Sequence, residues 1–235
     1  MRELVRLRDV TDTFLAEGAI GYVVGLLDVR GADDSSYASF CHEALDDARA
    51  ATSVLGLEAA VALAELGHPS VRADAAALVA AADPSLRAEL PSWCAHVGRV
   101  HVVEAGSLRT SDGSETVLHV LLDFDAGAAA GSRHLLSIAM QHKENRVHLL
   151  DVRARAPQDT IAPIAEQYAG SAEVLWSWRE AGELESLVGD AVRTTWTRSP
   201  DRWPVHDVEG AATPAWALGV RRLEQVTGTD LRARS

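Results

Sequence analysis

The chain has 235 residues, of which 47% are hydrophobic and 24% are charged, and its formal net charge is −12. This length can bury a core without disulfides, and two cysteines cannot form a disulfide framework, so we expect a reduced, cytoplasmic protein. The acidic balance argues against nucleic-acid binding. The lack of an apolar run of about 20 residues argues against a membrane span.

The first 95 residues are predicted to be helical. Hydrophobic residues recur there at helical spacing, and clusters of Gly, Pro, Ser and Asp separate the periodic stretches. The predicted helices cover residues 12–29, 36–55, 57–66 and 70–82, followed by a short helix that ends near Trp93. We therefore expect a helical N-terminal half.

From residue 99 onward, the hydrophobic pattern changes to the alternation typical of β-strands. Ser111–Ser114 and Lys143–Asn145 have the composition of tight turns between neighbouring strands. The predicted strands cover residues 99–105, 116–125, 134–141 and 146–153. This order predicts a four-stranded antiparallel β-meander.

The pattern returns to helix in the C-terminal part. Residues 159–195 are predicted to form two helices divided at Gly182, and a last helix is predicted over residues 215–226. The fold class is therefore α+β, with C-terminal helices packed on the sheet. We expect a helical region over residues 1–95 and a second region over 96–235, which can also form one continuous domain.

Six of the nine histidines lie within residues 96–148, in or next to the predicted strands. His119 and Asp123 share one face of the second strand because side chains alternate along a strand. If the strand register brings such residues together, they can bind a divalent metal or perform acid–base chemistry. The alternative is that they are ordinary surface histidines. The catalytic candidates are His119, Asp123, His142 and Asp151, and the metal-binding candidates are His119, His142 and His148.

Cysteines offer a second, weaker metal hypothesis. Cys41 and His42, together with Cys94 and His96, supply four ligand types that zinc accepts. Structural zinc sites space their cysteines by two to four residues, and these pairs do not follow that spacing. We therefore favour buried free thiols.

Tryptophans are concentrated near the C-terminus. Trp176, Trp178 and Trp196 are predicted to form an apolar surface for a partner or ligand. Residues two apart on a helix point in different directions, so one of Trp176 and Trp178 would face a second element, a ligand or a partner chain. The alternative is that both pack against neighbouring helices.

Two segments, LPSWCAHVGRV and RHLLSIAMQHKENRVHLLDV, resemble part of a group of helix-flanked α+β proteins from GC-rich bacteria. In the pattern of that group, a histidine opens the third strand, an Asp-His pair ends it, and a Lys-Asp pair follows on the fourth. His134, His142 and Asp151 match this pattern, whereas Gln141 and Leu150 stand at its charged positions. The resemblance implies the meander and marks His142 and Asp151, but it implies no activity.

No nucleophile elbow and no phosphate-binding loop is present in the sequence. We therefore expect a non-catalytic binding or regulatory protein without a cofactor, whose partner is another protein or a second copy of the chain. One alternative is a small metal-dependent hydrolase with a His/Asp site on the sheet. The other is an immunity-type protein whose acidic surface masks a basic partner.

Overall fold

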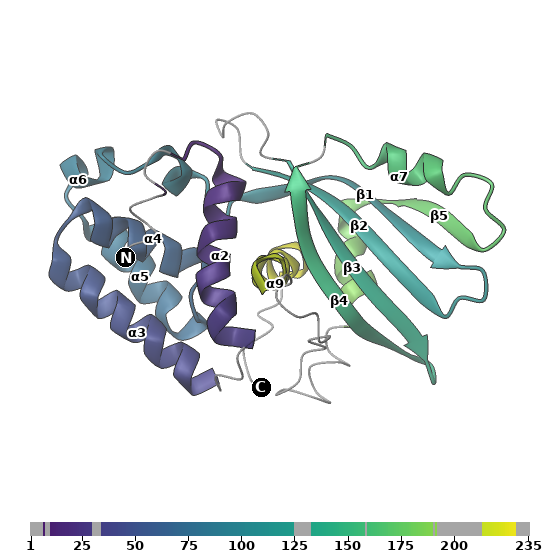
Figure 1. Ribbon diagram of the computed structural model, residues 1–235, viewed down its shortest axis with the longest axis horizontal. Helices are drawn as coiled ribbons and strands as arrows, with labels where there is room; N and C mark the ends of the chain where they lie inside the picture. Colours follow the sequence, from purple (N-terminus) through teal and green to yellow (C-terminus); the bar gives the residue numbers. More distant parts are fainter. Residues whose placement is uncertain are drawn as a thin grey trace. The chain divides into compact units, whose positions relative to one another are not determined.

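The computed structural model divides into two compact units (Figure 1). Unit 1 comprises residues 1–99 and 124–132, and unit 2 comprises residues 100–123 and 133–235. The structure describes residues 7, 10–29, 34–124, 133–157, 159–189, 191 and 213–228.

Unit 1 is helical, as the sequence predicted. Its elements are α2 (Thr13–Val29), α3 (Asp34–Ala51), α4 (Val54–Leu66), α5 (Pro69–Ala81), α6 (Pro84–Ala88) and the 3-10 helix η1 (Ser92–Ala95). The predicted helix over 36–55 is too long, because Thr52 adopts a positive φ of 40° and ends α3. Ser53 then caps α4 by accepting a hydrogen bond from the Gly56 amide at 3.2 Å.

Unit 1 has its own apolar core. Six buried residues of α3, α4 and α5 form one cluster: Tyr37, Cys41, Leu45, Leu63, Val71 and Ala75. The Tyr37 hydroxyl donates to the Leu66 carbonyl at 3.0 Å, so its polar end is satisfied inside this core. Trp93 is fully buried and its indole N–H donates to the Leu7 carbonyl at 3.2 Å.

Unit 2 contains one antiparallel sheet of five strands, not the four that the sequence predicted. The strands are β1 (Val100–Thr110), β2 (Glu115–Phe124), β3 (His134–Lys143), β4 (Arg146–Pro157) and β5 (Val174–Arg179). Their order in the sheet is β4-β3-β2-β1-β5, so the four predicted strands form the expected meander and β5 adds an edge next to β1.

The extra strand lies in a region that was predicted to be helical. Within residues 159–195 the described elements are α7 (Ala162–Gln167), β5, the 3-10 helix η2 (Ala181–Glu183) and a helical segment over 184–189. Gly170 lies between α7 and β5 and has a positive φ of 79°, a backbone conformation that residues with a side chain rarely adopt. The sequence VLWSWR then pairs with β1 along its whole length.

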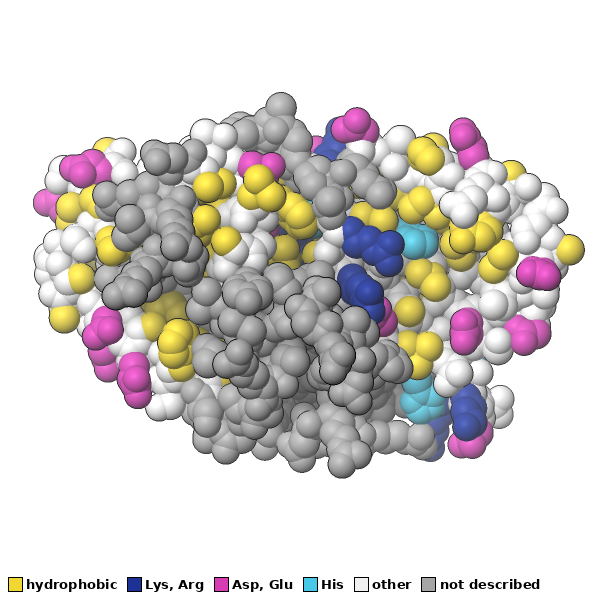
Figure 2. Space-filling view, in the orientation of Figure 1, with side chains coloured by type: hydrophobic (Ala, Val, Ile, Leu, Met, Phe, Trp, Pro, Cys, Tyr) yellow, Lys and Arg dark blue, Asp and Glu magenta, His cyan; other side chains and the backbone are white. Residues whose placement is uncertain are grey.

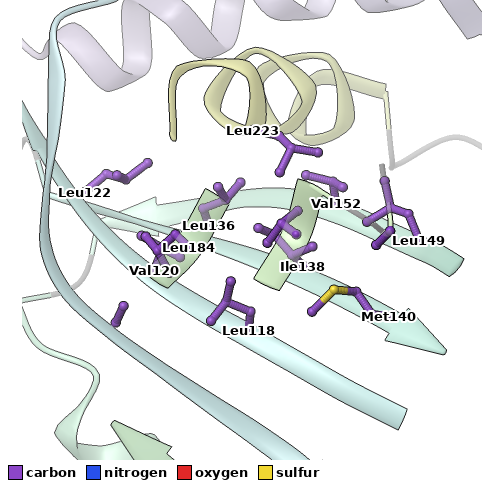
Figure 3. Packing of buried hydrophobic residues seen from close by; sticks show 13 residues of the cluster. Leu118, Val120, Leu122, Leu136, Ile138, Met140, Leu149, Val152, Leu184 and Leu223 are labelled. Atoms are coloured by element: carbon purple, nitrogen blue, oxygen red, sulfur yellow. The ribbon is translucent and has the colours of Figure 1, made fainter. Parts of the chain in front are cut away.

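One face of the sheet carries the main core of unit 2 (Figure 3). α9 (Thr213–Thr227) contributes Leu223, and the helical segment 184–189 contributes Leu184 and Val188. The strands contribute Leu118, Val120, Leu122, Leu136, Ile138, Met140, Leu149 and Val152. The prediction that C-terminal helices pack on the sheet is therefore confirmed for α9 and the segment 184–189, but not for residues 174–179, which form β5.

A glycine allows α9 to approach β4 closely. A Cβ placed on Gly219 would lie 2.9 Å from the Val152 carbonyl oxygen, which is closer than real Cβ atoms come.

Among the helices that the structure describes, none is both long and apolar enough to cross a lipid bilayer.

Candidate functional site

The opposite face of the sheet is only partly covered. Leu121 of β2 and Leu135 of β3 are directly opposite each other and form a small buried cluster with Ile161, which precedes α7. Trp176 packs against this cluster from β5. Polar and aromatic side chains also lie on this face, so it is the place to look for binding or chemistry.

Trp176, Trp178 and His119 form a continuous row of rings on this face. The Trp176 and Trp178 rings meet edge to face, with centroids 5.4 Å apart and planes at 84°. Trp176 also stacks on His119, with centroids 6.2 Å apart and planes at 22°. We call these three residues, together with Ser137 and Arg155, the aromatic face.

Gly106 makes this row possible. β1 lies between β5 and β2, so the Trp176 ring must cross β1 to reach His119. A Cβ on Gly106 would lie 2.6 Å from Cη2 of Trp176 and closer still to Cζ2. Only a residue without a side chain leaves room for the ring, which is a known use of glycine in a strand interior.

His119 is buried and electrically neutral. Its side chain lies opposite Ser137 in the register of β2 and β3, and Nδ1 lies 3.2 Å from the Ser137 hydroxyl. Burial, and then the positive charge of Arg155, lower the pKa of His119 to about 4. At neutral pH this imidazole is therefore an uncharged hydrogen-bonding group.

Two arginines of β4 border the aromatic face. Arg155 is opposite Leu135 and Arg153 is opposite Ser137, so both share the face of His119. Arg153 is paired with Asp151 at 2.6 Å, whereas Arg155 is exposed and forms no ion pair with the described residues. In Figure 2, basic side chains lie beside a histidine over the sheet, next to hydrophobic ones.

Both candidate carboxylates are neutralised by neighbouring arginines. Asp123 accepts a hydrogen bond from Nε of Arg133 at 2.9 Å, and Arg133 also donates to the Asp159 carbonyl at 3.1 Å. Asp151 is held by Arg153 in the same way. Asp123 does share the face of His119, as predicted from alternation, but it lies four residues along β2, a distance of about 13 Å.

The three candidate metal-binding histidines do not converge. His142 lies five residues along β3 from Ser137, the residue opposite His119, which corresponds to about 16 Å. Its Nε2 lies 2.9 Å from the Thr116 hydroxyl, and burial, followed by the charge of Arg109, lowers the pKa of His142. His148 is opposite Gln141 and so faces the other way from His142.

The described part of the chain contains no group of three or more His, Cys, Asp or Glu side chains arranged to hold a metal ion. Cys41 is buried in the core of unit 1, and burial, followed by the charge of Glu58, raises the pKa of the Cys94 thiol. Both cysteines are free thiols. Neither cysteine belongs to a metal-binding group among the described residues, so the Cys/His hypothesis gains no support from the structure.

The tryptophan prediction needs correction in its geometry. Trp176 and Trp178 lie on a strand, not on a helix, so residues two apart point to the same face and touch each other. Trp196 lies outside the described residues. Gly106, Ser137 and Arg155 were not singled out from the sequence, although a glycine inside a strand is a recognised sign of close approach.

No protein-family model, no curated protein and no solved structure matches this chain.

Proposed function

We propose that this is a non-catalytic binding protein and that the aromatic face is its binding site. The observation that carries the proposal is the exposure of Trp178. Its side chain is 55% exposed although Trp176 holds it edge to face, so the ring is both positioned and accessible. Exposed, rigid tryptophans are common anchors in binding interfaces.

The properties of His119 argue against catalysis at this place. Ser137 and His119 form a hydroxyl–imidazole pair, which is part of the arrangement that activates a nucleophile. However, a base with a pKa of about 4 takes up a proton poorly at neutral pH, and no carboxylate among the described residues is bonded to the ring. The separation of His119, His142 and His148 likewise gives no support to a metal-dependent hydrolase.

The chemistry of the face favours a planar, apolar group that carries negative charge. Trp178 offers a ring for stacking, and Arg155 offers a cation that is not paired with any described residue. His119 adds a neutral hydrogen-bonding group between them. Because β5 and β4 are the two edges of the sheet, about 19 Å apart, a partner that matches all three needs an aromatic or apolar group for Trp178 and a separate negative group near Arg155.

The probe for this proposal is 8-anilinonaphthalene-1-sulfonate, which carries a planar naphthalene ring and a negatively charged sulfonate. We expect it to bind the native protein and to receive excitation energy from tryptophan. Trp178→Ala should weaken binding by about 2- to 12-fold, the value of one aromatic contact. Arg155→Gln should weaken it by less than about fivefold, and added salt should reduce that difference.

Phe40→Ala is the matched control, because Phe40 is an exposed aromatic residue, 37% accessible, on α3 of unit 1. Its removal should leave probe binding unchanged. If the native protein does not bind the probe, or if Trp178→Ala binds it as tightly as the native chain, the aromatic face is not the binding site.

A further inference from the structure

We infer that the chain forms a symmetric dimer in which β5 pairs with β5 of a second copy, extending the sheet across the two molecules. This goes beyond the proposed function, since it concerns the backbone edge of β5 rather than its aromatic face. The two ideas can therefore fail separately. The argument rests on the edge hydrogen-bonding groups, the exposed side chains and the charges of this strand.

The outer edge of β5 has backbone groups available for pairing. The Glu173 carbonyl accepts from the Ser111 amide at 2.8 Å, so it points toward β1. Because these groups alternate along a strand, those of Val174, Trp176 and Trp178 point to the open edge. Within the described residues, the outward backbone groups of Trp176 and Trp178 form no hydrogen bonds, and the Val174 amide donates only to the Ser171 hydroxyl at 3.3 Å.

Exposed hydrophobic side chains are concentrated on the same strand. Among the residues whose side chains the structure describes, four large hydrophobic residues are exposed: Leu15, Phe40, Leu175 and Trp178. Two of the four lie on the six residues of β5, one on each face of the sheet. An apolar, unpaired edge strand without lysine or proline is a template for pairing with another strand.

The symmetry of a dimer restricts its register. In a continuous sheet the two-fold axis is perpendicular to the sheet, so residues directly opposite each other share a face and have the same parity. The pairing that uses all three outward residues places Trp176 opposite Trp176 of the second copy. It also places Val174 opposite Trp178 of the second copy, so all three outward residues take part in the pairing.

In this register, charged residues at the two ends of β5 lie opposite residues of the opposite charge in the second copy. Glu173 is exposed and would lie opposite Arg179 of the second copy, and the symmetric contact repeats this pair. Arg179 uses its Nε for the Ser107 hydroxyl at 3.0 Å, which leaves its terminal nitrogens for a carboxylate. This self-complementarity favours a second copy over an unrelated strand.

The other sheet edge lacks these properties. β4 carries Arg146, Arg153 and Arg155 and ends at Pro157. Arginines and a terminal proline are features by which edge strands avoid pairing. Only β5 therefore combines an open backbone, apolar side chains and opposite charges at its two ends.

Sedimentation of the full chain over a wide micromolar range tests the inference. We expect the mean mass to rise from that of a monomer to that of a dimer. Leu175→Lys should raise the dissociation constant at least about tenfold, since a symmetric interface contains each substitution twice. Leu15→Lys is the control, because Leu15 is equally exposed, 60% against 57%, but lies on α2.

Charge reversal tests the register. Glu173→Arg and Arg179→Glu should each weaken the dimer, and the double variant should recover it. Both residues lie at the ends of the strand, and circular dichroism verifies that each variant folds. A chain that stays monomeric, a dimer indifferent to Leu175→Lys, or a double variant that does not recover would each overturn the inference.

Discussion

Replacing Gly106 by alanine tests how the aromatic face is built. The new methyl group would occupy the space of the Trp176 ring, with Cη2 2.6 Å from the Cβ position. The indole ring is rigid, so it must swing away from His119 as a whole. Overpacking of this kind costs about 1–3 kcal/mol, and an aromatic ring contact is worth about 0.5–1.5 kcal/mol.

Three measurements follow the change. Urea denaturation should show a loss of about 1–3 kcal/mol. The near-ultraviolet circular dichroism of the Trp176–Trp178 pair should weaken, because the edge-to-face arrangement is disturbed. The pKa of His119, measured by NMR, should rise from about 4 toward its ordinary value of 6.5, because the ring that excludes water from it has moved.

Gly182→Ala is the control for this experiment. Gly182 is exposed, and no neighbouring heavy atom lies within 4 Å of the position where a Cβ would be placed. It should leave all three measurements close to those of the native chain. If Gly106→Ala leaves the near-ultraviolet signal and the pKa of His119 unchanged, Trp176 does not cross β1 onto His119 and the reasoning is wrong.

Three further predictions concern unit 2. The pKa of His119 is about 4 in the folded chain and 6.5 in the unfolded chain. Its contribution to the free energy of unfolding is therefore present above pH 6.5 and is lost as the pH falls toward 4, by up to about 3 kcal/mol. Urea denaturation should show this loss in the native chain and not in His119→Gln. Arg155→Gln should raise the pKa of His119 in an NMR titration, since it removes a nearby positive charge. Arg222 is fully buried and donates to Nε2 of His134 at 2.9 Å, so Arg222→Ala should cost at least about 2 kcal/mol in the same denaturation assay.

The helices of unit 1 and the first four strands could be predicted from sequence because their hydrophobic period is local. β5 could not, since its six residues gain stability from pairing with β1, which sequence spacing does not reveal. The capping residues near Asp159 and the helix-breaking Gly182 fit the predicted pair of helices as well as they fit the observed strand. Short apolar segments of this kind depend on their tertiary context.

The candidate site shows the same division between local and long-range information. Alternation alone placed His119 and Asp123 on one face, and the structure agrees. Whether His142 and His148 approach His119 depends on strand register, and the register separates them. The contact between Trp176 and His119 depends on a glycine in a third strand, which no pairwise spacing could indicate.

The passage of Trp176 across β1 has a practical consequence for following this protein in solution. The indole belongs to the outermost strand, yet it lies over an imidazole of β2, near the middle of the sheet. Aromatic ring currents displace the resonances of nearby protons, so the imidazole signals of His119 are sensitive to small tilts of the indole. His119 is therefore a native NMR reporter, without any added label, of events at the outer strand.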